Sequence, residues 1–254
     1  MSLVDLTEKK VIITGSSRGI GYAIAECFAQ QGGSVVISSR RQDACETAAL
    51  KINSDSGRNA AFPIAADISS KTDLNALIDE GVKALGGLDC LICNAASSPY
   101  YGPLIKTPDE AFKTVLQNNI LSSHWLIQRA APHLEDSSSG SIIVIASIGA
   151  FRTYENIGAY SVSKAAVLQL VRSYAQELGQ QNIRINSICP GVIETDFSKS
   201  TISKPAIRKG LEEATCLGRL GVPEDIAPMA AFLASSQSSY TTGQHFVIDG
   251  GASL

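Results

Sequence analysis

The sequence lacks the features that mark several large classes of protein. Charge of one sign is not in excess, since 21 Lys and Arg against 24 Asp and Glu leave a net charge of -3. There is no long basic run, and there is no apolar stretch of the roughly 18 residues that a membrane-spanning helix needs. We therefore expect neither nucleic acid nor a membrane among its partners.

Secretion and metal binding also lack their usual signals. The first ten residues, MSLVDLTEKK, carry acidic side chains and no apolar core of a secretory signal, so we expect a cytoplasmic protein. Of the six cysteines only Cys90 and Cys93 are closely spaced, and they lie in an apolar run that resembles a buried strand. Neighbouring side chains of a strand face opposite sides, and no second Cys or His pair stands at zinc-ligand spacing. We predict core thiols and no metal site.

Short apolar runs alternate with amphipathic stretches along the whole chain. The runs VIIT, SVVIS and SIIVIA are nearly continuous in β-branched residues, which is typical of strands buried on both faces of a parallel sheet. The predicted strands are Lys10–Thr14, Ser34–Ser38, Ala60–Ala65, Cys90–Cys93, Ser141–Ala146, Ile183–Ile188 and His245–Ile248. The predicted helices are Ile20–Gln31, Gln42–Asn53, Lys71–Leu85, Pro108–Ala130, Tyr160–Leu178 and Pro223–Ala234. This alternation predicts an α/β fold, with a doubly wound, seven-stranded parallel sheet flanked by helices.

One segment, Val192–Cys216, interrupts this alternation. It is mixed in character and contains no predicted strand. Long insertions in compact α/β domains usually form lids or binding loops. No linker rich in Pro, Gly or Ser divides the chain, so we expect a single domain over 1–254 with a substrate loop at about 192–216.

A glycine-rich turn joins the first predicted strand to the first predicted helix. Its sequence from Thr14 to Gly21 is TGSSRGIG, a Gly-x3-Gly-x-Gly spacing. Glycines allow the tight turn and the close approach of a pyrophosphate, which then lies at the positive helix N-terminus. A merely structural turn is the alternative, and the strand–turn–helix context argues against it. The residues expected to contact a dinucleotide here are Gly15, Ser17, Arg18, Gly19, Ile20 and Gly21.

The end of the second predicted strand indicates which dinucleotide is bound. An NAD site carries an acid there for the ribose 2′-hydroxyl, whereas arginine suits the 2′-phosphate of NADP. Ser39 stands at this position and is followed by Arg40 and Arg41, while Arg18 is close by in the glycine turn. Guanidinium groups bind phosphate, and an acid would repel it. This pattern favours NADP(H), although the same arginines could simply be solvated.

A candidate proton donor lies in the helix predicted from Tyr160. Tyr160 and Lys164 are four residues apart and therefore share a face of that helix. A tyrosine with its ordinary pKa of about 10 is a reluctant acid, and a nearby ammonium group lowers that pKa. Ser147, at the end of the fifth predicted strand, offers a hydroxyl to the reacting oxygen. A Tyr-x3-Lys pair is common in helices, so its meaning depends on the glycine turn and on Ser147.

These motifs together resemble the short-chain dehydrogenase/reductase family. The matching elements are Thr14–Gly21, Asp67-Ile68, Cys93–Ala96, Asn119-Ile120, Ser147, Tyr160-x3-Lys164, Pro190-Gly191, Thr195 and Val247–Gly251, in family order. The resemblance implies a single Rossmann-type domain assembled as a homotetramer. It implies that Tyr160 is the acid/base, that Ser147 positions the substrate oxygen, and that Lys164 binds the nicotinamide ribose and lowers the Tyr160 pKa.

The resemblance also implies roles for the remaining motif residues. Asn119 would hold a water that connects Lys164 to a proton relay. The residues implied to contact the cofactor elsewhere are Asp67 and Ile68 at the adenine, Asn94 and Ala95 near the adenosine ribose, Pro190 and Gly191, and Ile193 and Thr195 at the nicotinamide carboxamide. The family's Asn-Asn-Ala-Gly reads Cys93-Asn94-Ala95-Ala96, from which we expect slightly altered strand packing and intact cofactor binding.

The substrate is less well indicated. Three loops (96–106, 149–159 and 192–216) should surround the nicotinamide and supply aromatic side chains suited to an apolar carbonyl, namely Tyr100, Tyr101, Phe151, Tyr154 and Phe197. Within the family, VVISSRR, NAASSPYYG and GRLGVPED resemble peroxisomal NADPH-dependent carbonyl reductases, which act on retinal and dicarbonyls. Their basic C-terminal tripeptide is replaced by Ala252-Ser253-Leu254, which favours the cytoplasm.

Several functions stay open at this level. The leading expectation is reduction of a ketone or aldehyde by NADPH. A 3-oxoacyl-carrier-protein reductase would carry a basic patch, and none is clear. An alcohol or sterol dehydrogenase working oxidatively with NAD would carry an acid in place of Arg40. A catalytically silent nucleotide sensor would have lost Ser147, Tyr160 or Lys164, and all three are present.

Overall fold

The computed structural model describes residues 4–254 and contains one seven-stranded sheet in the order β3-β2-β1-β4-β5-β6-β7, with every neighbouring pair parallel. The strands are β1 (Lys10–Thr14), β2 (Ser34–Ser38), β3 (Ala61–Pro63), β4 (Cys90–Cys93), β5 (Ser141–Ile145), β6 (Arg184–Pro190) and β7 (His245–Ile248). The chain starts in the middle of the sheet, builds outward to β3, then crosses back to β4 and builds to β7. The predicted doubly wound α/β fold is confirmed.

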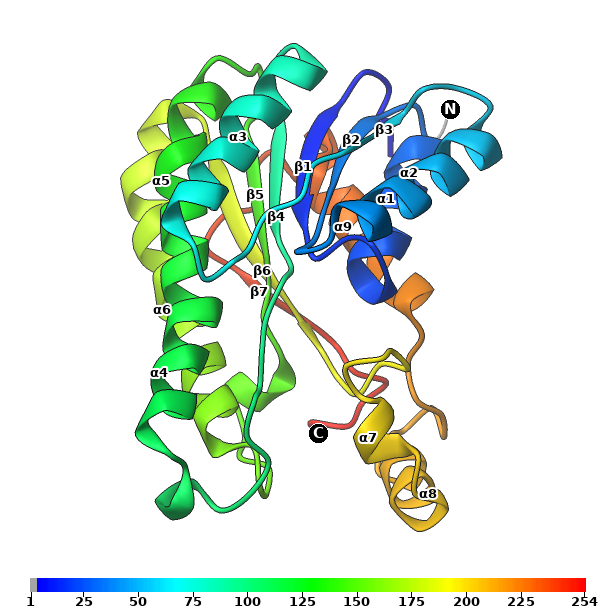
Figure 1. The fold of residues 1–254 in the computed structure, drawn as a ribbon, viewed down its shortest axis with the longest axis vertical. Coiled ribbons are helices and arrows are strands. Elements are labelled where there is room, and N and C mark those ends of the chain that lie inside the picture. The colour runs from blue at the N-terminus through cyan, green and yellow to red at the C-terminus, as the bar shows by residue number, and fades with distance from the viewer. Residues whose placement is uncertain (1–3) are drawn as a thin grey trace.

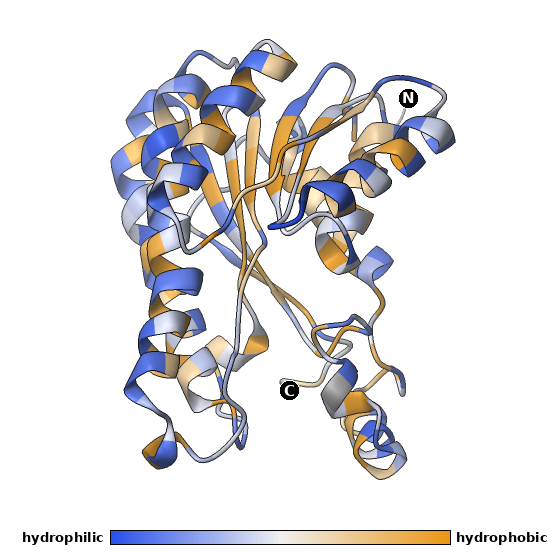
Figure 2. Cartoon of the chain, viewed as in Figure 1, coloured by the Kyte–Doolittle hydropathy of each residue, from blue (hydrophilic) through white to orange (hydrophobic). Residues whose placement is uncertain are grey.

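Helices cover both faces of the sheet (Figure 1). One face carries α1 (Gly19–Gln30), α2 (Gln42–Ser56) and α9 (Pro223–Ala234); the other carries α3 (Lys71–Leu85), α5 (Ser122–Glu135) and α6 (Gly158–Leu178). Successive side chains of a strand point to opposite faces of the sheet. Val11 and Ile13 therefore pack in the core beneath α1, α2 and α9, and Ile12 packs in the core beneath α3, α5 and α6. In Figure 2 the strands form an apolar band between helices whose outer surfaces are polar.

The same parity separates the two closely spaced cysteines. Cys90 belongs to the core beneath α1, α2 and α9, whereas Cys93 belongs to the core beneath α3, α5 and α6. Burial raises the pKa of each thiol to about 12. Because the two side chains lie on opposite faces of the sheet, they do not form a joint ligand pair.

Two predicted elements differ markedly from the structure, whereas the others differ by at most three residues at either end. Strand β3 covers only Ala61–Pro63 instead of the predicted Ala60–Ala65; it is an edge strand, where a proline is tolerated. The predicted helix Pro108–Ala130 is divided into α4 (Asp109–Leu116), a π-helical turn (Gln117–Leu121) and α5. Short 3-10 turns cover Leu104–Lys106, Ile148–Ala150, Gly179–Gln181 and Ser236–Ser238.

The predicted loop at 192–216 is partly helical. It contains α7 (Lys199–Ile202) and α8 (Pro205–Glu213), which begins with a proline in its first turn. Both helices lie beyond the carboxyl end of β6, at the edge where parallel sheets bind ligands (Figure 1). Among residues 4–254, no helix has the length and hydropathy to cross a membrane.

Candidate active site

The glycine turn between β1 and α1 is shaped for a close backbone approach. Gly15 and Gly19 have φ angles of +65° and +59°, a region that other residues rarely occupy. A Cβ on Gly21 would lie 2.5 Å from the Gly15 carbonyl oxygen. The backbone at Arg18 is extended, and no side chain within residues 4–254 caps the first turn of α1. A helix N-terminus with free amides fits a pyrophosphate, so these residues suit a dinucleotide.

Asn94 braces this turn from the neighbouring strand. Its Nδ2 donates to the carbonyl oxygens of Thr14 at 2.9 Å and of Gly15 at 3.0 Å. The backbone N–H groups of Asn94 and Ala95 donate in return to the Thr14 hydroxyl, at 3.1 and 3.2 Å. The motif after β4 thus holds the glycine turn in shape, which is a structural task in addition to the ribose contact expected from sequence.

The three arginines near the expected 2′-phosphate position differ in their pairing. Arg41 forms an ion pair with Asp43, and Arg18 pairs with Asp196, Nη1 to Oδ2, at 2.9 Å. Arg40 is exposed and has no ion pair with any residue from 4 to 254. Ser39 directs its hydroxyl to the Arg41 carbonyl oxygen at 3.3 Å. Arg40 is therefore the guanidinium group most available to an incoming anion.

The expected adenine contacts come from the segment after β3. Oδ1 of Asp67 accepts hydrogen bonds from the backbone N–H and the hydroxyl of Ser69, at 2.9 and 2.8 Å. Ile68 packs on the core beneath α3, α5 and α6. Gln117, at the start of the π-helical turn, donates to the Ser69 carbonyl oxygen at 2.7 Å. The segment is thereby held next to the carboxyl edge of the sheet.

Tyr160 and Lys164 lie on one face of α6, as expected. The Lys164 Nζ lies 5.5 Å from the centroid of the Tyr160 ring and donates to the Ile145 carbonyl oxygen at 2.7 Å. Burial lowers the pKa of Lys164 to about 8, since it disfavours the charged ammonium form. Burial also raises the pKa of Tyr160 to about 12, although its hydrogen bond with the Ser147 hydroxyl acts in the opposite direction.

The direction for Tyr160 differs from the sequence expectation that Lys164 lowers its pKa. Burial disfavours the phenolate more strongly than neighbouring groups favour it. The Cys189 thiol on β6 adds to the rise in the pKa of Tyr160. As arranged here, Tyr160 is a proton-carrying phenol at neutral pH.

Ser147 lies at the point where β5 ends. Its side chain caps the 3-10 turn Ile148–Ala150 by accepting from the Gly149 N–H at 3.0 Å. This bond orients the hydroxyl towards α6, where it interacts with Tyr160. The structure therefore brings together the three residues that the sequence motifs proposed, Ser147, Tyr160 and Lys164.

Asn119 connects the π-helical turn to α6 from a buried position. Its Nδ2 donates to Ser163 Oγ at 2.9 Å and to the Ser97 carbonyl oxygen at 3.0 Å, and its Oδ1 accepts from the Ser97 N–H at 2.8 Å. Ser163 Oγ donates in turn to the Tyr160 carbonyl oxygen at 2.7 Å. Ser97 and Ser163 were missed from sequence, and the position of Ser163 between Tyr160 and Lys164 was the available signal. Single-turn π-helices often occur at functional sites.

Residues 193–198, between β6 and α7, lie over this site and are called the cover segment below. The Phe197 ring lies 5.8 Å from the Tyr160 ring, centroid to centroid, at an angle of 42°. Thr195 packs on the glycine turn, with its Cγ2 3.3 Å from where a Cβ of Gly19 would be. Ile193 is buried, and Gly191 donates to the Ile248 carbonyl oxygen at 2.9 Å, which ties Pro190-Gly191 to β7.

The other expected aromatic residues have different neighbours. Phe151 faces His245, with ring centroids 6.4 Å apart, and Tyr154 lies against Arg152. Tyr101 is exposed, and the Tyr100 hydroxyl lies against Gly102. Of the five predicted aromatics, Phe197 is the one whose ring lies on Tyr160.

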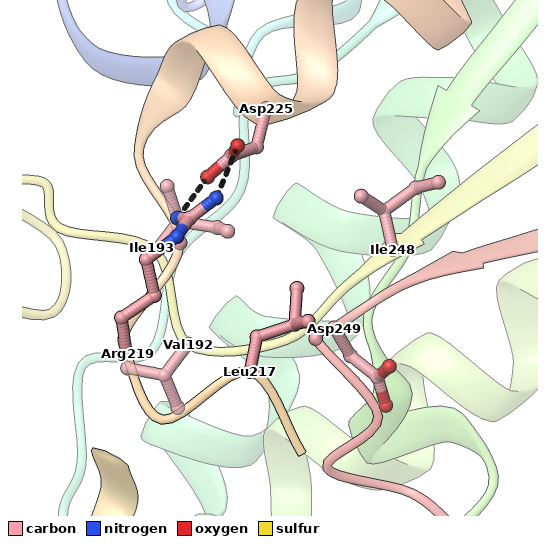
Figure 3. Close-up of a pocket in the computed structure, with 9 residues that line it drawn as sticks. Val192, Ile193, Leu217, Arg219, Asp225, Ile248 and Asp249 are labelled. Carbon is pink, nitrogen blue, oxygen red and sulfur yellow. Dashed lines mark hydrogen bonds and ion pairs between the residues drawn. The ribbon is translucent and has the colours of Figure 1, made fainter. Parts of the chain in front are cut away.

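A cavity of about 140 Å³ lies behind Ile193 (Figure 3). Val192, Ile193, Leu217 and Ile248 supply its apolar wall. Its charged groups are already engaged: Arg219 forms two bonds with Asp225, at 2.6 and 2.8 Å. None of Ser147, Tyr160 and Lys164 lines this cavity, whereas the expected cofactor contact Ile193 does, so the cavity adjoins the candidate active site on the far side of Ile193.

Comparison with known proteins gives consistent matches over the whole chain. A family profile described as Enoyl-(Acyl carrier protein) reductase matches residues 15–253. Dehydrogenase/reductase SDR family member 4 of Bos taurus is 35% identical over 97% of this chain and 88% of its own length. Short-chain dehydrogenase/reductase SDRA of Arabidopsis thaliana is 37% identical over 97% of this chain and 95% of its own length.

Solved structures agree with these sequences. A 7α-hydroxysteroid dehydrogenase in complex with NADH and 7-oxo glycochenodeoxycholic acid is 39% identical, with a TM-score of 0.91 over 97% of this chain and 95% of that one. A short-chain type dehydrogenase/reductase from Mycobacterium marinum is 33% identical, with a TM-score of 0.92 over 98% and 97% of the two chains. The similarity extends across the glycine turn, the Tyr160 helix and the cover segment.

Proposed function

Because this chain belongs to the short-chain dehydrogenase/reductase family, whose members are oxidoreductases with a nicotinamide cofactor and a small-molecule substrate, we propose that it is an NADP(H)-dependent carbonyl reductase. The observation that carries the proposal is the cluster of Ser147, Tyr160 and Lys164, of which Lys164 is buried and the other two are partly buried, with Phe197 packed against Tyr160. A phenol next to a hydroxyl and an ammonium group fits proton transfer to a carbonyl oxygen.

In the proposed reaction the bound nicotinamide supplies the hydride that reaches the carbonyl carbon. Tyr160 donates its phenolic proton to the oxygen as negative charge develops there, and Ser147 Oγ donates a hydrogen bond to the same oxygen. Because burial raises the pKa of Tyr160 to about 12, the phenol holds its proton at neutral pH and is in the form that a proton donor needs. The Phe197 ring packs against the Tyr160 ring and covers one side of it.

Lys164 and Asn119 support Tyr160 in this proposal. The ammonium group of Lys164, in reach of the Tyr160 ring, is suited to bind the nicotinamide ribose. Asn119 holds the backbone of Tyr160 through Ser163. The main-chain carbonyl oxygen of Asn119 lies in the π-helical turn, where it is suited to hold the water of a proton relay. Both residues act through position and charge rather than through a bond to substrate.

The preference for NADP(H) rests on charge at the adenosine end. Arg40 is exposed and unpaired by any described side chain, Ser39 replaces an acid, and Arg18 lies in the glycine turn. A guanidinium group binds a phosphate with charge-assisted hydrogen bonds, whereas the 2′-hydroxyl of NAD would find no carboxylate at Ser39. The remaining cofactor residues proposed are those named from the sequence motifs.

The proposal is tested by a panel of carbonyl compounds with NADPH, followed by loss of NADPH absorbance. Aromatic ketones, α-dicarbonyls, retinal, quinones and acetoacetyl thioesters cover the chemistry that Phe197 and the neighbouring loops would accept. Faster turnover of ketones or aldehydes with NADPH than with NADH supports the proposal. Turnover confined to carrier-protein thioesters would favour a 3-oxoacyl-carrier-protein reductase.

A second candidate function is an alcohol or sterol dehydrogenase that works oxidatively with NAD. The solved hydroxysteroid dehydrogenase with NADH and an oxo bile acid, at 39% identity, favours it. Arg40 at the adenosine end opposes it. Initial rates of hydroxysteroid oxidation with NAD and NADP distinguish the two candidates.

We also propose a homotetramer in the cytoplasm, in keeping with the family resemblance. Val247 on the edge strand β7 and Phe151 beside it are exposed apolar side chains. Apolar groups on a sheet edge suit a contact between subunits. Light scattering on the purified protein measures the assembly, and a monomer at micromolar concentration would contradict it.

A further inference from the structure

The glycine turn and the cover segment are joined by an ion pair between residues 178 positions apart in the chain. Arg18 Nη1 lies 2.9 Å from Asp196 Oδ2, and the two side chains are 74% and 54% exposed. Arg18 precedes α1, where the pyrophosphate is expected, and Asp196 lies between Thr195, which packs on Gly19, and Phe197, which packs on Tyr160. The pair therefore connects the phosphate end of the cofactor site to the catalytic end.

The position of Asp196 is defined by its own segment. Ser198 Oγ donates to the Ile193 carbonyl oxygen at 2.6 Å and accepts from the Thr195 N–H at 3.1 Å, which closes a turn around Asp196. Glu194 is held by two bonds from Arg208 of α8, at 2.6 and 3.1 Å. The carboxylate of Asp196 is thus presented to Arg18 by a braced turn rather than by a free loop.

We propose that Asp196 sets the cofactor preference of this protein, because it holds Arg18 in an ion pair that a 2′-phosphate has to displace. The inference rests on the proposed use of NADP(H) and adds a residue to it. An exposed carboxylate–guanidinium pair is weak, so a phosphate dianion with bidentate geometry replaces it. The 2′-hydroxyl of NAD(H) carries no charge and leaves the pair intact.

The consequence is a smaller preference for NADP(H) than the arginines alone would give. Because the turn that carries Asp196 is held by Ser198 and by the Glu194–Arg208 bonds, it keeps its position when Arg18 is displaced. Asp196 touches neither substrate nor reacting atoms; it acts through Arg18 and is a specificity-determining residue.

The test uses two fragments that reach only the adenosine end of the site. The dissociation constants of adenosine 2′,5′-bisphosphate and adenosine 5′-monophosphate are measured calorimetrically for the wild-type protein and for Asp196→Asn. We expect the ratio of the two constants to shift about fivefold in favour of the bisphosphate in Asp196→Asn. The matched control is Glu213→Gln, which removes one negative charge from an exposed Lys209 pair in the same region and leaves the ratio unchanged.

A second background shows whether the effect passes through Arg18. In Arg18→Gln, the Asp196→Asn change should shift the ratio by less than about twofold, since the pair is already broken. An unchanged ratio in Asp196→Asn alone, or an equal shift with and without Arg18, would overturn the role of Asp196. If the wild-type protein does not prefer the bisphosphate but Asp196→Asn does, the proposed use of NADP(H) fails while the role of Asp196 stands.

Discussion

The Nζ atom of Lys164 lies 5.5 Å from the ring centroid of Tyr160 while donating its hydrogen bond to the Ile145 carbonyl oxygen. The ammonium group therefore faces the ring of the tyrosine and is bonded to the backbone of β5. Burial lowers the pKa of Lys164 to about 8 and raises the pKa of Tyr160 to about 12. The two groups thus titrate in well-separated ranges, and each should be visible in kinetics.

The first prediction concerns the pH dependence of reduction. Tyr160 keeps its proton far above neutrality, so the descending limb of kcat/KM near pH 8 belongs to Lys164, whose charge is lost as the pH rises through its lowered pKa. Lys164→Arg should remove this limb, because a guanidinium group stays charged. The measurement is kcat/KM for the carbonyl substrate with NADPH from pH 6 to pH 10, a range that extends about 2 pH units to either side of the Lys164 pKa. If Lys164→Arg keeps the descending limb of the pH profile, another group titrates there. If the turnover of the variant is too low to measure, the pH dependence of NADPH affinity in the two proteins gives the same comparison.

The second prediction concerns the buried Asn119 bonds. Asn119→Ala removes the partner of Ser163 Oγ and of both backbone groups of Ser97. We expect the free energy of unfolding to fall by about 2 to 3 kcal/mol, because buried polar groups lose their hydrogen bonds. Urea denaturation measures this change. Ser173→Ala, which removes an exposed serine bond within α6, is the matched control and should change stability by less than about 0.5 kcal/mol.

How far the sequence predicts the fold can be judged from particular elements. All seven strands were predicted, most clearly β1, β2 and β5, whose nearly continuous β-branched runs reflect burial on both faces of the sheet. The π-helical turn at Gln117–Leu121 was missed, since helical periodicity continues through it. The α7 and α8 helices were also missed, because they span only four and nine residues, which is too short for helical periodicity to be decisive.

In the candidate site, too, some residues were predicted from the sequence and others were missed. Ser147, Tyr160 and Lys164 were found from motif spacing, since each follows from the end of a strand or the turn of a helix. The Arg18–Asp196 pair and the Asn119–Ser163 bond were not found, because each joins residues far apart in the chain. The rise in the Tyr160 pKa was not foreseen either, since burial depends on the packing of β6 and Phe197.

A third prediction follows from the crowding at Gly21. In Gly21→Ala the new methyl group would meet the Gly15 carbonyl oxygen at 2.5 Å and Asn94 Nδ2 at 2.6 Å. The glycine turn has to shift, so we expect NADPH affinity to fall at least about tenfold together with thermal stability. Gly210→Ala in α8, where nothing lies within 4 Å, is the control and should leave NADPH affinity unchanged. Normal NADPH binding by Gly21→Ala would exclude the turn from the phosphate site.

A fourth prediction concerns Arg40. Arg40→Asp should raise the KM for NADPH sharply and move the preference towards NADH, since it replaces the available guanidinium with a carboxylate that repels a 2′-phosphate and accepts from a 2′-hydroxyl. Initial rates with both cofactors measure the shift. Lys199→Asp makes the same charge change at an exposed position in α7 and should have little effect. A ratio of NADPH to NADH efficiency that barely moves in Arg40→Asp would place the 2′-phosphate elsewhere.

The most direct test of the account is the turnover of Tyr160→Phe compared with its affinity for NADPH. The substitution removes only the phenolic oxygen and leaves the ring that packs on Phe197. We predict that kcat falls by about 10²- to 10⁴-fold, as for the loss of a general acid, while the dissociation constant of NADPH stays within about twofold of wild type. Substantial residual turnover with normal NADPH binding would contradict the assignment of Tyr160 as the proton donor.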